Sequence, residues 1–115
     1  MIEVITTDEF VAWYDDLDEA DTKAVVRVVD LLAARGVSLL FPYSSDIKGS
    51  RYTLRELHVQ SGGKPLRILY AFDPLRQAVL LLGADKTGMS DKEFYATYIH
   101  HAEDLWEEYL RETRS

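Results

Sequence analysis

The chain has 115 residues, of which 47% are hydrophobic, and a formal net charge of −7. This length suits one domain over residues 1–115, with a real core, and is too short for two. The sequence has no cysteine, which excludes a disulfide framework and a cysteine-based zinc site. The start, Met1–Phe10, lacks the features of a secretory signal, and no segment approaches the roughly 18–20 apolar residues that span a bilayer. We therefore expect a soluble cytoplasmic protein with no membrane contact.

The negative charge is unevenly distributed along the chain. Residues 1–35 carry nine acidic and three basic side chains, residues 36–90 carry four and seven, and residues 91–115 carry seven and three. The overall charge disfavours nucleic acid, since phosphate binding depends on Lys and Arg that displace counterions. The basic middle segment leaves two interpretations open: an anion-binding surface, or exposed strands that carry arginine for solubility.

The first third of the chain predicts a short strand and two helices. Ile2–Ile5 is an apolar run typical of a buried strand, and Thr7 is suited to cap a first helix. Asp18 is a second predicted N-cap, for a helix that ends near Gly36. The apolar residues of this second helix follow the spacing i, i+3, i+4, i+7: Val25, Val28, Val29 and Leu32. The two consecutive helices are expected to form a helical hairpin.

A loop with Pro42 and Gly49 precedes three β-like runs, which are Tyr52–Val59, Leu66–Phe72 and Ala78–Gly83. The runs are joined by two turn sequences, Ser61-Gly62-Gly63-Lys64-Pro65 and Asp73-Pro74-Leu75-Arg76. Ser90 and Glu93 match a capping box at the start of a last helix. The order of strand, two helices, three strands and a helix predicts an α+β fold with an antiparallel β-meander.

Most candidate functional residues lie on or beside this meander. They are Arg51, Arg55 and His58 on the first strand, Arg67 on the second, Asp85 and Lys86 after the third, and Lys48 in the loop before them. In a regular strand Arg51 and Arg55 share one face, while His58 points to the other. Grouped cations repel one another unless they meet an anion, so this grouping indicates a phosphate-binding surface.

The histidines and Tyr95 supply the candidates for proton transfer. His58 lies on the basic meander, and its imidazole suits proton transfer near neutral pH. His100 and His101 are about 100° apart on a helix, so they cannot both face one metal, and we expect neither a metal nor a cofactor. Tyr95, in the first turn of the last helix, could stack on a base or assist proton transfer. Core packing or surface exposure is the ordinary alternative for each of them.

These residues belong to motifs that follow one another in a recognisable order. The motifs are Arg55-Glu56-Leu57-His58, Gly62-Gly63, Arg67-Ile68-Leu69-Tyr70-Ala71-Phe72-Asp73-Pro74, Arg76-Gln77-Ala78-Val79-Leu80-Leu81, Asp85-Lys86-Thr87-Gly88 and Phe94-Tyr95. With them, the chain resembles the HigB-like toxins of the RelE/ParE toxin superfamily over about residues 47–110. The resemblance implies a RelE-like fold, cleavage of mRNA in the ribosomal A site, and inhibition by a cognate antitoxin. In HigB-like pairs the antitoxin is often a helix-turn-helix repressor, so any DNA contact would come through it.

The resemblance assigns roles to individual residues of this sequence. Arg67 matches the arginine that opens the family's second strand, Lys86 the lysine of its Asp-Lys motif, and Tyr95 the aromatic residue of the last helix. His58 stands where these relatives usually have arginine, which could weaken phosphate binding, move the base role to the imidazole, or mark lost activity.

We therefore predict a ribosome-dependent, metal-independent mRNA endonuclease that inhibits translation, in which the RNA 2′-hydroxyl attacks the adjacent phosphate. The predicted catalytic residues are Arg67, Lys86, His58 and Tyr95, and the predicted RNA-binding residues are Arg51, Arg55 and Lys48. Two alternatives stay open. One is a ParE-like toxin that binds gyrase without nuclease chemistry, and the other is an inactive module that only binds the antitoxin.

Overall fold

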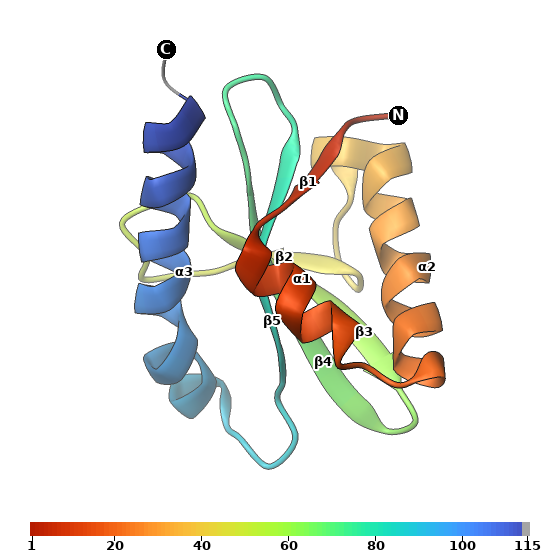
Figure 1. The fold of residues 1–115 in the computed structure, drawn as a ribbon. Coiled ribbons are helices and arrows are strands. Elements are labelled where there is room, and N and C mark those ends of the chain that lie inside the picture. Colours follow the sequence, from red (N-terminus) through yellow and green to blue (C-terminus); the bar gives the residue numbers. More distant parts are fainter. Residues whose placement is uncertain (114–115) are drawn as a thin grey trace.

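The computed structural model describes residues 1–113, which form a five-stranded mixed sheet with helices on both faces (Figure 1). In chain order the elements are β1 (Val4–Thr6), α1 (Asp8–Asp15), α2 (Glu19–Arg35), a 3-10 turn (Gly36–Ser38), β2 (Ser44–Asp46), β3 (Arg55–Ser61), β4 (Lys64–Phe72), β5 (Ala78–Asp85) and α3 (Asp91–Thr113). The predicted α+β class and element order are confirmed, with β2 as an additional strand.

The strands lie in the order β1-β5-β4-β3-β2. β3, β4 and β5 form the predicted antiparallel meander, whereas β1 pairs in parallel with β5. The turn between β3 and β4 depends on Gly62 and Gly63, whose φ angles are 55° and 80°. Residues with a side chain rarely adopt such positive φ angles, so the two adjacent glycines permit this hairpin.

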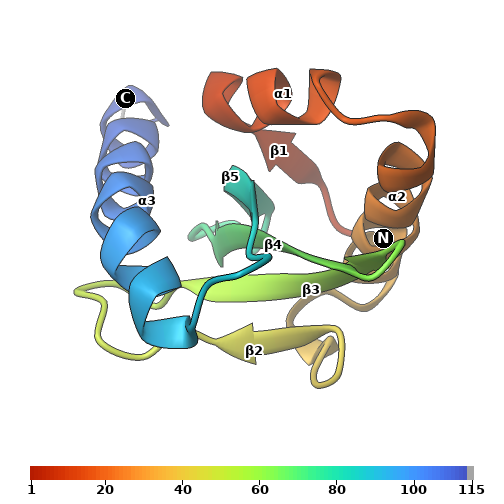
Figure 2. The ribbon, with the colours of Figure 1, turned by 90° about the horizontal axis from the view of Figure 1, so that it is seen from below.

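The sheet separates two hydrophobic cores. α1 and α2 pack on one face (Figure 2), where the buried residues include Phe10, Val25, Leu32, Ile68 and Tyr70. α3 covers the other face, where they include Leu69, Leu81, Phe94, Ala102 and Trp106. Successive strand residues point to opposite faces, so β1, β4 and β5 contribute to both cores. No helix within residues 1–113 has the length and apolar character needed to cross a bilayer.

The predicted helix caps form in the structure. The side chains of Thr7 and Asp18 each accept a hydrogen bond from the backbone N–H three residues later, at 3.0 and 2.8 Å. At the start of α3, Ser90 Oγ accepts from the Glu93 N–H at 3.2 Å, and Glu93 Oε1 accepts from the Ser90 N–H at 3.3 Å. This reciprocal pair is a capping box, and it sets where α3 begins.

The first strand of the meander starts later than predicted, which corrects an expectation about the arginines. The run Tyr52–Val59 becomes a strand only at Arg55, because the segment before it is bound to α3. Glu103 Oε2 accepts hydrogen bonds from the Arg51 N–H and the Ser50 hydroxyl, both at 2.8 Å. The prediction that Arg51 and Arg55 share a strand face is therefore wrong, since Arg51 lies outside the strand.

The short strand β2 is not predicted by the sequence, because Ser44-Ser45-Asp46 shows no apolar alternation. It pairs antiparallel with the start of β3, and Ser44 Oγ lies 2.6 Å from the Tyr70 hydroxyl. Tertiary contacts thus form this strand. It also places Ser45 directly opposite Glu56.

Candidate functional site

A group of polar side chains lies where β3, β4 and the loop between β5 and α3 meet. We define the polar cluster as Glu56, His58, Arg67, Lys86, Asp91 and Tyr95. His58 and Arg67 are direct cross-strand partners in the β3–β4 pair, and Glu56 is paired with Leu69, a residue of the core beneath α3. Alternation along the strands therefore directs Glu56, His58 and Arg67 to the α3 face of the sheet.

Glu56 is at the centre of the polar cluster and is only 4% exposed. Both of its carboxylate oxygens lie 2.9 Å from the hydroxyl of Tyr95, which donates to them. Oε1 also lies 3.2 Å from His58 Nε2, and that nitrogen lies 2.8 Å from Ser45 Oγ. A carboxylate only accepts hydrogen bonds, so the proton of the neutral imidazole belongs on Nε2. The lone pair of Nδ1 is then available to accept a proton.

Tyr95 has a defined role in this arrangement. Burial raises the pKa of the Tyr95 phenol far above its ordinary value, and the hydrogen bond to Glu56 raises that pKa further. The phenol therefore stays protonated at neutral pH, and its proton is engaged by the Glu56 carboxylate. Tyr95 holds Glu56 in place, and through Glu56 it orients His58.

The cations Arg67 and Lys86 converge on the same place. Lys86 Nζ lies 2.8 Å from Asp91 Oδ1, in an ion pair where the lysine side chain is 16% exposed and the aspartate side chain 75%. The pKa of Asp91 is lowered, first by its hydrogen bond with Lys86 and also by the nearby Arg67 and His58. Arg67 makes no ion pair within residues 1–113, and its Nη1 donates to the Leu66 carbonyl at 3.1 Å.

The three predicted RNA-binding residues lie outside the polar cluster. The Arg55 side chain points to the opposite face of the sheet and is ion-paired with Asp46. Arg51 Nη2 lies 3.5 Å from a carboxylate oxygen of Glu103 on α3, and Lys48 is exposed in the loop between β2 and β3. The polar cluster therefore brings together His58, Arg67, Lys86 and Tyr95, but not Arg51, Arg55 or Lys48.

Comparison with known proteins identifies the family. The profile of the phage-derived Gp49-like proteins (DUF891) matches residues 12–107. Two proteins of Mycobacterium tuberculosis are similar to the chain. One, named "Putative toxin HigB2", is 34% identical over 101 residues, which cover 86% of this chain and 50% of that protein. The other, named "Putative toxin HigB3", is 35% identical over 108 residues, which cover 93% of this chain and 92% of that protein.

The chain belongs to the Gp49-like family of HigB-like toxins. The resemblance that the motifs of the meander indicate is thereby confirmed. The chain spans half the length of HigB2 and nearly all of HigB3.

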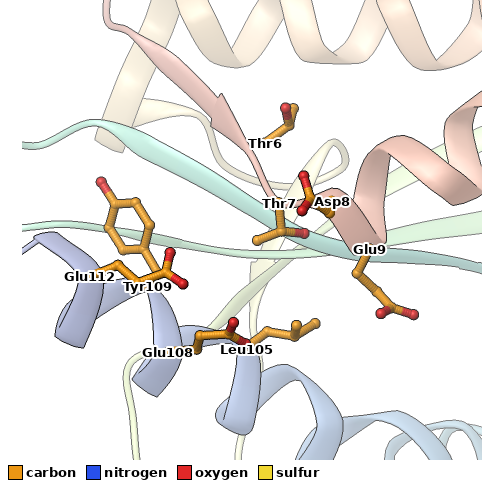
Figure 3. A pocket seen from close by; sticks show the side chains of 8 residues that line it. All are labelled: Thr6, Thr7, Asp8, Glu9, Leu105, Glu108, Tyr109 and Glu112. Atoms are coloured by element: carbon orange, nitrogen blue, oxygen red, sulfur yellow. The ribbon is translucent and has the colours of Figure 1, made fainter.

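Two cavities of this HigB-like toxin differ sharply in charge. One of about 340 Å³ lies between α1 and the end of α3 (Figure 3) and is lined by four carboxylates, those of Asp8, Glu9, Glu108 and Glu112. Negative charge there opposes RNA phosphates. Another, of about 540 Å³, adjoins the polar cluster through His58 and has no acidic lining residue.

In the part of the chain that the structure describes, no three His, Asp or Glu side chains are grouped to hold a metal ion.

Three members of the site are absent from the residues singled out by sequence reasoning. Glu56 could have been found, because it is two residues from His58 and residues so spaced share a strand face. Ser45 and Asp91 carry no such signal. Ser45 reaches His58 because β2 pairs with β3, and Asp91 reaches Lys86 because the loop after β5 turns back toward the sheet.

Proposed function

We propose that this HigB-like toxin inhibits translation by cleaving mRNA on the ribosome, without a metal ion. The observation that supports the proposal is the polar cluster, in which two cations lie beside an imidazole whose Nε2 is held by protein groups. Arg67 is free of ion pairs within residues 1–113, and His58 contacts Glu56 and Ser45. Such a site combines a proton acceptor with positive charge, which is what RNA cleavage by internal attack requires.

The chemistry uses the RNA's own 2′-hydroxyl as the nucleophile. Its oxygen attacks the adjacent phosphorus, His58 Nδ1 accepts the hydroxyl proton, and the bond to the 5′-oxygen of the next nucleotide breaks. The leaving oxygen takes a proton from water, and a 2′,3′-cyclic phosphate remains. Proton transfer of this kind usually accelerates a reaction about 100- to 10,000-fold.

Arg67 and Lys86 stabilise the additional negative charge that develops on the phosphate during the attack. Loss of one well-placed donor of this kind typically costs roughly 3–4 kcal/mol in the barrier. Lys86 is paired with Asp91 in the free protein, but the Asp91 side chain is 75% exposed. Because the Asp91 side chain is so exposed, it can turn away into solvent, and an RNA phosphate can then take its place at Lys86.

A cognate antitoxin, of the helix-turn-helix type, would hold the toxin inactive in the cytoplasm. Under this proposal the toxin meets mRNA on the ribosome, and it meets DNA only indirectly through the antitoxin. The partner explains how a cell tolerates the free catalytic surface. The proposal does not depend on which face of the toxin the antitoxin covers.

The test is cleavage of mRNA bound in programmed ribosomes by the purified full-length toxin. We expect the wild-type protein to cut, and Arg67→Ala and Lys86→Ala each to lower the maximal rate about 100- to 1,000-fold. Arg111→Ala is the matched control, because Arg111 is exposed and lies 20 residues from Asp91 in α3, roughly 30 Å along the helix. The control should cut like the wild type.

Three results would contradict the proposal in different ways. Full activity of the Arg67→Ala, Lys86→Ala double variant would remove the polar cluster as the active site. Growth arrest with intact mRNA and altered DNA supercoiling would identify the ParE-like alternative, a toxin that binds gyrase. Expression without the antitoxin that leaves growth unaffected, together with no cleavage in vitro, would identify an inactive binding module.

A further inference from the structure

Large hydrophobic side chains are exposed along the segment that leads into β2. The exposed fractions are 53% for Val37, 62% for Leu40, 82% for Phe41 and 38% for Tyr43. The segment is nevertheless fixed on the protein. Leu39 is only 1% exposed, and the Tyr43 carbonyl accepts a hydrogen bond from the His58 N–H at 2.9 Å. Apolar side chains displayed on an anchored segment indicate a binding surface.

Phe41 and Tyr43 line the cavity of about 540 Å³ that adjoins the polar cluster. Arg27 of α2 also lines it, and His58 and Arg67 connect it to the polar cluster. None of its lining residues is acidic, although the chain has a net charge of −7. The cavity therefore combines exposed aromatic rings with positive charge, in contrast to the carboxylate-lined cavity of Figure 3.

This combination suits single-stranded RNA. Proteins bind unpaired nucleotides by stacking bases on aromatic rings, while cationic side chains hold the sugar-phosphate backbone. The volume also lies within the roughly 300–1,000 Å³ typical of sites for small ligands, which is enough for one nucleotide. A protein segment could cover the apolar side chains too, but only an acidic one would pair with Arg27 and Arg67, whereas every RNA segment supplies phosphates.

We infer that Phe41 and Tyr43 form a subsite for a nucleobase next to the scissile phosphate, with Arg27 bound to a neighbouring phosphate. The inference rests on the proposed function for the identity of the ligand as RNA. His58 and Arg67 belong to both sites, so a base held on Phe41 would share this cavity with the phosphate that they contact. The subsite positions the RNA and takes no part in bond breaking.

The experiment measures single-turnover cleavage of mRNA in programmed ribosomes while the toxin concentration is varied. Phe41→Ala should raise the half-saturating concentration about 5- to 150-fold, the range that loss of one base–aromatic stack produces. The maximal rate should stay within about threefold of the wild type, because the polar cluster is unchanged. Phe41→Tyr keeps an aromatic ring and should behave like the wild type, whereas Phe41→Leu keeps only apolar area and should behave like Phe41→Ala.

Two controls separate the subsite from general effects on the surface or the fold. Leu75→Ala removes another exposed apolar side chain, 78% exposed in the turn between β4 and β5, and should leave cleavage unchanged. Because Phe41 is 82% exposed, its variants should also unfold at the same urea concentration as the wild type. A shifted midpoint would mean that Phe41 acts on the fold, which would overturn the inference.

Failure of the subsite and failure of the proposed function give different results. If the wild type cuts and Phe41→Ala has an unchanged half-saturating concentration, the subsite is refuted and the nuclease stands. The subsite is likewise refuted if Phe41→Leu has the half-saturating concentration of the wild type. It is also refuted if Phe41→Ala cuts mRNA like the wild type and loses only its affinity for the antitoxin. If the wild type does not cut, the proposed function fails, and binding of a 2′-O-methylated oligoribonucleotide tests the subsite alone. No binding, or equal binding by wild type and Phe41→Ala, would then refute the subsite as well.

Discussion

Substitution of Tyr95 by phenylalanine tests the hydrogen bonds at the centre of the polar cluster. The change removes one hydroxyl and leaves the ring, so packing is preserved. The lost hydroxyl lies 2.9 Å from each oxygen of Glu56, a carboxylate that is 4% exposed. A hydrogen bond to a charged group contributes about 1.5–3 kcal/mol, so we expect the free energy of unfolding to fall by about that amount.

Urea unfolding at neutral pH measures this loss, because the midpoint and slope give the free energy of unfolding in water. Tyr98→Phe is the matched control. Tyr98 lies on the same helix and packs against Phe94 with ring centroids 4.8 Å apart, but within residues 1–113 its hydroxyl has no hydrogen-bond partner. A loss below about 0.5 kcal/mol, or one equal to that of the control, would refute the inferred bond between Tyr95 and Glu56.

The same variant also separates a positioning role for Tyr95 from a chemical one. Removal of a group that transfers a proton costs about 100- to 10,000-fold in rate. Because Tyr95 acts through Glu56, we expect the maximal rate to fall only about tenfold in Tyr95→Phe. A loss of about 100-fold or more would show that Tyr95 transfers a proton itself. An unchanged rate would show that Tyr95 supports the fold alone.

Three further predictions concern the stability of the fold, the contact between Lys86 and RNA phosphate, and the stability at acidic pH. Gly83→Ala should lower the free energy of unfolding by about 1–3 kcal/mol in urea, because its new Cβ would lie 2.2 Å from the ring of Trp13. Asp91→Asn should release Lys86 from its ion pair, so RNA binding should tighten. The slope of log binding constant against log salt concentration should become steeper by about 0.7, which RNA titrations at several salt concentrations measure. Burial alone would raise the pKa of Asp73, but hydrogen bonds from the turn after β4 and from α3 lower it overall from 3.8. The Asp73 carboxylate therefore stabilises the fold above about pH 4, and this stabilisation is lost as the pH falls through the lowered pKa. The free energy of unfolding of Asp73→Asn should fall less between neutral and acidic pH than that of the wild type. Urea unfolding at several pH values measures the difference.

Local interactions made much of the fold predictable from the sequence. The capping box of Ser90 and Glu93 spans three residues, and the turn at Gly62 and Gly63 needs only the positive φ that glycine permits. Each depends on groups a few residues apart, so the sequence alone indicates where these elements start and turn. The motifs from Arg55 onward likewise indicated the family. Alternation along β3 would also have placed Glu56 beside His58, although Glu56 was not among the predicted site residues.

Contacts between distant segments decided the rest. β2 forms because Ser44–Asp46 meets the edge of β3. The predicted strand starts at Arg55 and not at Tyr52, because Glu103 of α3 binds the preceding backbone. Tyr95 reaches Glu56 across 39 residues of chain, a pairing that no local pattern encodes. Such contacts depend on how α3 packs on the sheet. Local sequence patterns therefore determined every helix and every strand but β2, and the ordered motifs carried the resemblance to the family. Tertiary packing alone determined which charges meet, because the charged groups come from segments that are distant in the sequence.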